Sequence, residues 1–343
     1  MKASGQVNDT TSSGRICVIF PGALGDFICF LPTLQFLRRD SEIDLFAHNE
    51  FAAIVRTRVT VRSLDCFEIG RLFAPGAAHD ARVQSTFGTY AAVYSWTGSQ
   101  ERMFVEQLNF VSNGRAQIFP FRPSGTTKHQ ADYYLHCLST QPSGCCEPRI
   151  EFSAEEIAWR EKFWCDNGLH QRLVLVLGPG SGAREKNWPE NFFVTIAKWW
   201  RESIRGEVVL LVGPVEAERG GIDQLRQNCL VANGLNLAQV AALLANSDLY
   251  LGNDSGISHL AAAVGVRTVA LFGPSDQFRW SPRGPKVSVI RRQLSCSPCS
   301  DAIMKSCPHR ACLTGLRPEK IIDELACLPE LANLTRWGVG ITV

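Results

Sequence analysis

Four short apolar runs in the second half of the chain end in glycine, and this repeated pattern constrains the fold more than any other feature of the sequence. The runs are RLVLVLGPG, EVVLLVGP, SDLYLGND and TVALFGP, and a helical pattern precedes or follows each of them. Strands that alternate with helices are typical of βα units on a parallel sheet. The pattern therefore predicts a doubly wound, Rossmann-like α/β domain.

The first half of the chain shows the same alternation less clearly. RICVIF precedes a predicted helix at residues 26–39, IDLFAHN precedes one at 51–58, and AAVYSW precedes one at 101–110, whereas residues 61–90 follow no clear pattern. A chain of 343 residues also exceeds the roughly 250–300 residues at which one hydrophobic core stops growing. We therefore expect two domains of similar α/β type.

The predicted domain boundary lies near residue 150. The stretch QPSGCCEP collects structure breakers, and the SAEEIAWREKFWCDNG that follows is typical of a helix capped by Ser153 and ended by Gly168. Ligands of such folds bind at the carboxyl ends of the strands, so we expect a ligand in a cleft between the two domains. The predicted segments are a flexible tail at 1–14, an N-terminal domain at 15–150, a C-terminal domain at 151–328 and a tail at 329–343.

Charge and hydropathy argue against nucleic-acid binding and against a membrane-spanning segment. The formal net charge is +2 and no basic run is present, so nucleic acid is not an expected partner. No signal peptide and no run of about eighteen apolar residues is found, which predicts a cytoplasmic protein with at most peripheral contact at the inner face of the inner membrane. In that compartment the thirteen cysteines are expected to be reduced thiols, most of them buried.

The loop after the first glycine-ended run, GPGSGAREKNWPENF, has the composition of an anion-binding loop. Glycines such as Gly182 let backbone N–H groups approach an anion, and Ser181 adds a hydroxyl donor. Lys186 lies just before a helix that is predicted to begin near Pro189, where its ammonium could reach a diphosphate. The alternative is an ordinary glycine-rich turn with a solvated lysine, since GxxxxGK[ST] and GxGxxG are both absent from this loop.

Two further loops follow glycine-ended runs. In LVGPVEAERGG, Glu216 could accept hydrogen bonds from a ribose or a base, or could simply favour the N-terminus of a helix. In GNDSGISHLAAAVG, Asp254, Ser255 and Gly256 open a helix of small residues, and His259 follows one turn later on the same face. This loop could bind a phosphate or a sugar hydroxyl, or could be an N-cap with a structural histidine. Three such loops at neighbouring strand ends favour a nucleotide diphosphate.

These loops, together with GALGD at residues 22–26 and GPSD at 273–276, resemble glycosyltransferase family 9, the heptosyltransferase family of lipopolysaccharide assembly. The resemblance covers roughly residues 15–328, with the motifs in the order that the family has. It implies the GT-B fold, in which two Rossmann-like domains face each other across a cleft. The N-terminal domain would hold a glycan or glycolipid acceptor, and the C-terminal domain a nucleotide sugar, typically ADP-heptose. The implied enzyme is inverting and needs no metal or cofactor, and this chain has no DxD motif.

The resemblance also implies roles for single residues. Asp26 matches the catalytic base, which takes a proton from the acceptor hydroxyl while that oxygen attacks the anomeric carbon; the alternative is a plain helix N-cap. The acceptor-side loop would consist of Gly22, Ala23 and Gly25. Cys29 and Phe30 stand where the best-known lipopolysaccharide heptosyltransferases have histidine and threonine. The implied residues for the donor sugar and the diphosphate are Ser181, Gly182, Lys186, Glu216, Asp254, Ser255, Gly256 and His259.

A cysteine-rich segment follows the last glycine-ended run. Cys296, Cys299, Cys307 and Cys312 have the spacing CxxC-x7-C-x4-C, and four thiolates could hold zinc or iron in a structural site. Free thiols or a redox-labile pair are the alternatives.

The predicted function is transfer of a sugar, most simply a heptose, from a nucleotide diphosphate onto a precursor of a bacterial surface glycan. Two other functions remain open on the sequence. A nucleotide-sugar-binding protein without turnover would bind the donor equally well with Asp26 replaced. A nucleotide-sugar epimerase on the same fold would convert the donor without any acceptor.

Overall fold

The computed structural model describes residues 14–123, 125, 127–138 and 147–328. The predicted C-terminal tail, the predicted N-terminal tail except Gly14, and most of the breaker stretch QPSGCCEP lie outside the described residues. The chain divides into two compact units, each built on one parallel sheet.

The first unit contains a five-stranded sheet in the order β3-β2-β1-β4-β5, with every neighbouring pair parallel. Its strands are β1 (Ile16–Ile19), β2 (Ile43–Ala47), β3 (Val59–Ser63), β4 (Val93–Ser95) and β5 (Ala116–Ile118). The α-helices that follow strands of this sheet are α1 (Leu24–Leu37), α2 (Phe67–Arg71), α3 (Ala81–Phe87) and α4 (Arg102–Val111). This order reverses direction between β1 and β4, as in a Rossmann-like domain.

The second unit contains a six-stranded sheet in the order β11-β10-β9-β6-β7-β8, again with every pair parallel. Its strands are β6 (Val174–Gly178), β7 (Glu207–Val212), β8 (Leu230–Asn233), β9 (Leu249–Asn253), β10 (Arg267–Phe272) and β11 (Val287–Arg291). All five residues of β6 and of β9 are buried, because helices cover both faces of a parallel sheet. The order reverses between β6 and β9.

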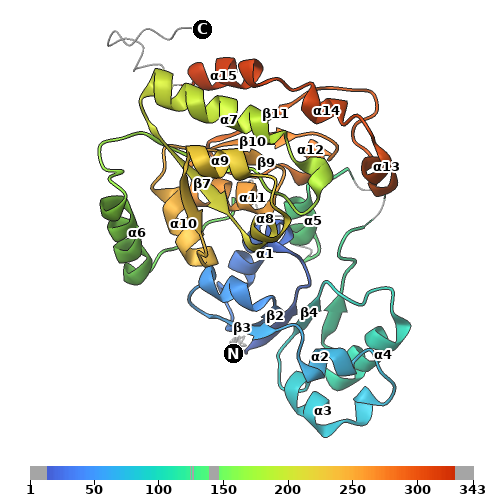
Figure 1. The fold of residues 1–343 in the computed structure, drawn as a ribbon. Helices are drawn as coiled ribbons and strands as arrows, with labels where there is room; N and C mark the ends of the chain where they lie inside the picture. The colour runs from blue at the N-terminus through green and yellow to red at the C-terminus, as the bar shows by residue number, and fades with distance from the viewer. Residues whose placement is uncertain (1–13, 124, 126, 139–146, 329–343) are drawn as a thin grey trace, which may run out of the picture. The chain divides into compact units, whose positions relative to one another are not determined.

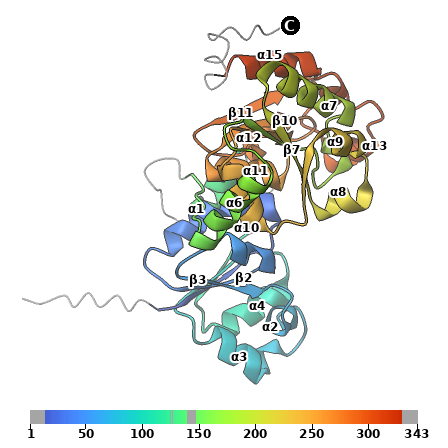
Figure 2. The same ribbon diagram turned by 60° about the vertical axis from the view of Figure 1, so that its left-hand side comes forward.

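The helices of the second unit complete its core. Figure 1 shows α7 and α15 side by side, and Figure 2 shows α10 beside α6 and α11. Trp188, Phe193, Trp200 and Leu313 belong to one buried apolar cluster of this unit. The helices are α5 (Gln130–His136), α6 (Ala154–Asp166), α7 (Glu190–Trp199), α8 (Pro214–Arg219), α9 (Asp223–Asn228), α10 (Leu237–Ala245), α11 (Gly256–Val264), α12 (Gln277–Trp280), α13 (Asp301–Ser306), α14 (Ala311–Thr314) and α15 (Pro318–Ala326).

The second unit is not one continuous stretch of sequence. Besides Ser124 onward it takes residues 53–55 and residues 23–33, which include the first part of α1, while the rest of α1 from Leu34 belongs to the first unit. The turn that carries Asp26 therefore packs as part of the second unit.

Several predicted elements are confirmed. The four glycine-ended runs form β6, β7, β9 and β10. Helix α6 begins after Ser153, whose hydroxyl accepts from the backbone N–H of Glu156 in a capping box, and Gly168 follows its end with a φ of 62°. Within the described residues, no helix is long and apolar enough to cross a membrane.

The predicted helix at 51–58 is wrong. Only a 3-10 helix forms there, at Asn49–Ala53, and Arg58 has a φ of 66°, which no right-handed helix allows. The backbone instead turns at Arg58 into β3, a strand that begins at Val59 and continues into the segment 61–90, where the sequence shows no clear pattern.

Candidate functional site

The candidate site lies at the carboxyl ends of β6 and β9, the two strands between which the second sheet reverses its order. At such a switch point the loops from neighbouring strands leave in opposite directions, so an open space remains for a ligand. The loop after β6 carries Ser181, Gly182 and Lys186, and the loop after β9 carries Asp254 and Ser255. The structure thus brings two of the three loops singled out from the sequence together at the switch point, and the third, which carries Glu216, meets the β6 loop at a neighbouring pocket.

An ion pair joins these two loops. The Nζ atom of Lys186 lies 2.8 Å from Oδ2 of Asp254, and the side chains are 28% and 9% exposed. The lysine ammonium is therefore held at the switch point while part of it remains accessible. A second cation or an anion placed there would compete directly for one of these partners.

Asn253 at the end of β9 is hydrogen-bonded to the loop after β6, and the sequence analysis gave this residue no role. Its Oδ1 accepts from the backbone N–H of Trp188 at 3.0 Å, and its Nδ2 donates to the carbonyl of Pro179 at 2.6 Å. The Ser181 hydroxyl bonds within its own loop, to the carbonyl of Ala183 and to Oδ1 of Asn187, both at 2.6 Å. Ser181 therefore shapes the loop, and Gly182 beside it is exposed.

The N-terminus of α11 follows the carboxyl end of β9 directly. Ser255 is its N-cap residue, whose hydroxyl accepts from the N–H of Ser258, and Gly256 is the first residue of the helix. Below this turn the buried Tyr250 hydroxyl lies 3.2 Å from Oγ of Ser258, and burial raises the pKa of Tyr250 to about 12. The helix N-terminus is thus braced from the sheet and offers backbone donors to an anion.

The first turn of α1 packs directly against this helix N-terminus. A Cβ atom built on Gly25 would lie 3.5 Å from Cα of Gly256 and 3.5 Å from Cδ2 of His259, so the two backbones touch with nothing between them. Asp26 is the third residue of α1 and is 5% exposed. It therefore lies inside the first turn, whereas an N-cap would precede Leu24.

His259 is buried between these elements. Its Nδ1 lies 3.6 Å from the Cys29 sulfur, and its ring also bonds to the backbone of Trp280. Burial lowers the pKa of His259 to about 4, and nearby His129 and Lys186 lower it further while Asp254 opposes them. The imidazole is therefore neutral at physiological pH, and a hydrogen bond from it to a ligand would have to replace one of these contacts.

A pocket of about 70 Å³ lies beside the β6–α7 loop. Glu216 lines it together with Ser181, and Oε2 of Glu216 also accepts from the N–H of Gly213 at 3.0 Å, which caps α8. The carboxylate thus has both roles that the sequence left open, a helix cap and a group at a pocket. The other lining residues are Pro179, Arg184, Asn187, Trp188, Glu190, Val215, Gly220, Gly221 and Ile222.

Three polar residues near the Cys29–His259 pair were not predicted. His129 accepts from the N–H of Ala131 and bonds through Nε2 to the carbonyl of Ser281 at 2.8 Å. Asp132 forms a double hydrogen bond with Arg283, which lowers the pKa of that carboxyl. No local pattern marks these residues, because α5 reaches the site only through the tertiary fold.

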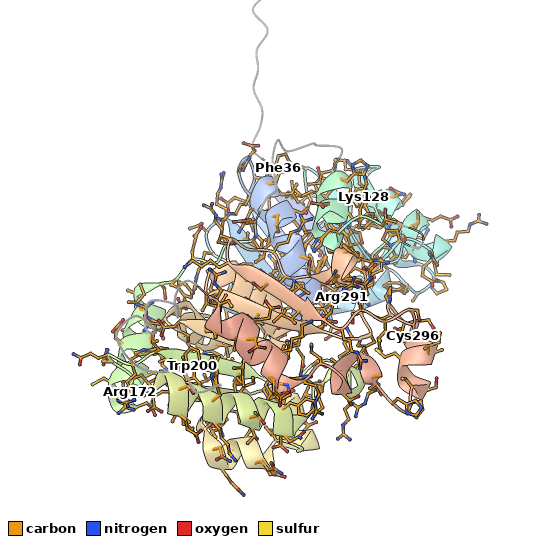
Figure 3. The ribbon with its side chains drawn as sticks, turned by 90° about the horizontal axis from the view of Figure 1, so that it is seen from above. Phe36, Lys128, Arg172, Trp200, Arg291 and Cys296 are labelled. Atoms are coloured by element: carbon orange, nitrogen blue, oxygen red, sulfur yellow. The ribbon has the colours of Figure 1, made fainter. Side chains whose placement is uncertain are left out.

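The cysteine-rich segment lies outside this cluster. Figure 3 shows Cys296 at the periphery, beyond the β11 strand that ends at Arg291. Electrostatic interactions link Cys312 to Cys299, Cys307 and Cys296, yet among the described residues no group of three or more His, Cys, Asp or Glu side chains is arranged to hold a metal ion. The four thiols are free.

Comparison with known proteins finds relatives and solved structures among heptosyltransferases and glycosyltransferase family 9. The chain is 32% identical over 222 residues to lipooligosaccharide heptosyltransferase 2 of Campylobacter jejuni, a stretch that spans 60% of this chain and 66% of that relative. The fold matches a glycosyl transferase family 9 structure from Veillonella parvula with a TM-score of 0.74 and 22% identity, over 94% of this chain and 98% of the other. It also matches E. coli ADP-heptose lps heptosyltransferase II with a TM-score of 0.67 and 20% identity, over 94% and 99%.

The predicted GT-B fold class, with two parallel-sheet α/β domains, is thereby confirmed. Residues 139–307 match glycosyltransferase family 9 (heptosyltransferase), a range that includes the loops of Lys186, Glu216 and Asp254 and the GPSD motif, but not GALGD. The chain therefore carries a glycosyltransferase family 9 domain, as the resemblance of its motifs indicates.

Proposed function

We propose that this protein is a glycosyltransferase that moves a heptose from ADP-heptose onto a glycan or glycolipid acceptor of lipopolysaccharide-type assembly. One observation carries the proposal: the Asp26 turn, the Lys186–Asp254 pair and the N-terminus of α11 converge at the switch point of the second sheet. The match to family 9 and the heptosyltransferases among its relatives support the donor and the acceptor class.

In the proposed reaction the charge of the leaving diphosphate is met by the protein. The Lys186 ammonium and the backbone N–H groups at the start of α11 are preorganised donors, which stabilise negative charge most where it grows in the transition state. The sequence has no DxD carboxylate pair, so we assign no step to a metal ion. The Glu216 carboxylate at the neighbouring pocket would accept hydrogen bonds from the ribose hydroxyls.

Asp26 is the proposed catalytic base. Its carboxylate would take the proton of the acceptor hydroxyl while that oxygen attacks the anomeric carbon from the side opposite the diphosphate. A single displacement of this kind inverts the configuration. The packing of Gly25 on Gly256 holds the turn that carries Asp26 beside the N-terminus of α11, and this supports the proposed role.

The test separates donor binding from transfer. ADP at about a hundred times its dissociation constant should stabilise the protein by roughly 2.7 kcal/mol, which a thermal shift detects easily. Lys186→Ala should abolish most of that shift, whereas Lys198→Ala, which removes an exposed lysine of α7, should keep it. Asp26→Asn should keep the shift and lower transfer about 10²–10⁴-fold.

Three outcomes would contradict the proposal. A shift that survives in Lys186→Ala would remove the lysine from the donor site. Transfer that survives in Asp26→Asn would remove the base. Conversion of ADP-heptose into an isomeric nucleotide sugar without any acceptor would show an isomerising enzyme.

A further inference from the structure

Cys29 and His259 form a buried side-chain pair to which the proposed reaction above assigns no step. Their Sγ and Nδ1 atoms lie 3.6 Å apart, and the residues are 4% and 5% exposed. They are separated by 230 positions in the sequence, and both belong to the second unit. A sulfur and a ring nitrogen at this distance in a dry environment form a hydrogen bond if one carries a proton and the other a lone pair.

The second bond of the ring fixes the direction of the first. The hydrogen bond between the Trp280 backbone and the His259 ring raises the pKa of the imidazole. A backbone group with this effect accepts a hydrogen from the ring, so the partner is the Trp280 carbonyl. A carbonyl only accepts, so the ring nitrogen that faces it carries the hydrogen. Since Nδ1 faces Cys29, Nε2 is the ring nitrogen left for the carbonyl; this assignment puts the hydrogen on Nε2 and makes the thiol the donor to an unprotonated Nδ1.

Both groups keep these protonation states at physiological pH. The groups that face His259 are Asp254 and Lys186 at the switch point, His129 at the N-cap of α5, and Cys29 from α1. The burial of His259 outweighs the attraction of the Asp254 carboxylate. Burial raises the pKa of the Cys29 thiol well above its usual value; the carboxylates of Asp26, Asp254 and Asp132 act in the same direction, and Arg283 opposes them. A neutral thiol donor and a neutral imidazole acceptor therefore persist.

The pair lies where it can set the position of Asp26. Cys29 follows Asp26 by three residues, so both project from the same side of α1. His259 lies in the first turns of α11, and its ring also touches the position of Gly25. The hydrogen bond thus fixes how α1 is rotated about its axis relative to the N-terminus of α11.

We propose that Cys29 is a positioning residue, whose thiol holds the His259 imidazole and thereby sets the Asp26 turn of α1 against the N-terminus of α11. The consequence for catalysis rests on the proposed function, because it assumes that Asp26 acts on an acceptor. The pair itself does not depend on that function, and it can be tested without any substrate.

The first test is NMR of the intact protein labelled with ¹⁵N-histidine. Long-range ¹H–¹⁵N spectra distinguish the two neutral tautomers, and His259→Gln identifies the resonances among the seven histidines. The wild type should show His259 with the hydrogen on Nε2 from about pH 6 to 8. Cys29→Ala should shift the Nδ1 resonance and raise the pH at which the ring protonates, whereas Cys17→Ala, which removes a fully buried thiol of β1, should leave it unchanged. Hydrogen on Nδ1 in the wild type, or an unchanged spectrum in Cys29→Ala, would overturn the proposal.

The second test is kinetic. Loss of one hydrogen bond should lower kcat of Cys29→Ala about 2- to 10-fold with the donor Kd nearly unchanged, because the donor loops keep their own contacts. Cys29→Ser keeps a donor and should recover part of the loss. Equal losses in both variants, or a loss confined to donor affinity, would reject the positioning role. A wild type without transfer activity would instead refute the proposed function, while the NMR result would still decide the pair.

Discussion

Adding one methyl group at Gly256 should destabilise the protein, although alanine is the better helix former. A Cβ on Gly256 would lie 2.9 Å from Cβ of Leu24 and 3.0 Å from the backbone nitrogen of Gly25, against about 3.5–4.0 Å for an ordinary contact between carbon atoms. Neither atom lies at the end of a flexible side chain, so α1 and α11 must move apart by about half an ångström. Overpacking of this kind costs about 1–3 kcal/mol, and the gain from replacing glycine in a helix offsets at most about 1 kcal/mol.

Gly25 provides the matched control on the other side of the same contact. A Cβ there would lie 3.5 Å from its nearest neighbours, and neither glycine has a positive φ. Gly25→Ala should therefore be neutral or stabilise the protein by up to about 1 kcal/mol, through the reduced freedom of the unfolded chain.

The two variants are compared by urea unfolding, followed by tryptophan fluorescence, and by transfer activity. We expect Gly256→Ala to lose about 1–2 kcal/mol of unfolding free energy net and also to lose transfer, since Asp26 moves with α1. Equal stability of the two variants, or a larger loss in Gly25→Ala, would refute the close contact between α1 and α11.

Three further predictions concern neighbouring residues. The pKa of His259 in the folded protein, about 4, lies below the usual 6.5, so the protein should lose up to roughly 3 kcal/mol of unfolding free energy as the pH falls from about 6.5 to 4. Urea titrations at several pH values should show that the unfolding free energy of His259→Gln depends less on pH. Tyr250→Phe removes the hydroxyl beneath α11 and should lower the unfolding free energy by about 0.5–1.5 kcal/mol, measured by urea unfolding. An unchanged midpoint would show that the bond between Tyr250 and Ser258 does not stabilise the start of α11. Glu216→Ala should weaken binding of ADP but not of pyrophosphate in calorimetric titrations, and equal losses for both ligands would place Glu216 near the diphosphate instead.

The central strands of the second sheet could be predicted from sequence because each is a continuous apolar run. The edge strands β8 and β11 were not predicted, since most of their residues are only partly buried and carry no such run. In the first unit, the turn at Arg58 depends on a left-handed backbone conformation at an ordinary residue, which no local signal announces.

The candidate site, too, could be predicted from the sequence only in part. The meeting of Lys186 and Asp254 follows from two loops at neighbouring strand ends, which the sequence pattern reveals. The approach of Cys29 and His129 to His259 depends on the path of α1 and α5 through the fold, and the sequence separation of 230 residues between Cys29 and His259 leaves no periodic signal. Packing partners of this kind become visible only in three dimensions.

The division of α1 between the two units also limits how such a protein can be recombined. Residues 23–33 belong with the second unit, although β1 before them and the end of α1 after them belong to the first. A hybrid made by exchanging one contiguous N-terminal half with a relative would pair the Asp26 turn of one parent with the α11 helix of the other. Hybrids that keep residues 23–33 with their own C-terminal half should retain the contact between Gly25 and Gly256, so parts of the first unit are best exchanged by grafting the strands and loops around this short insert.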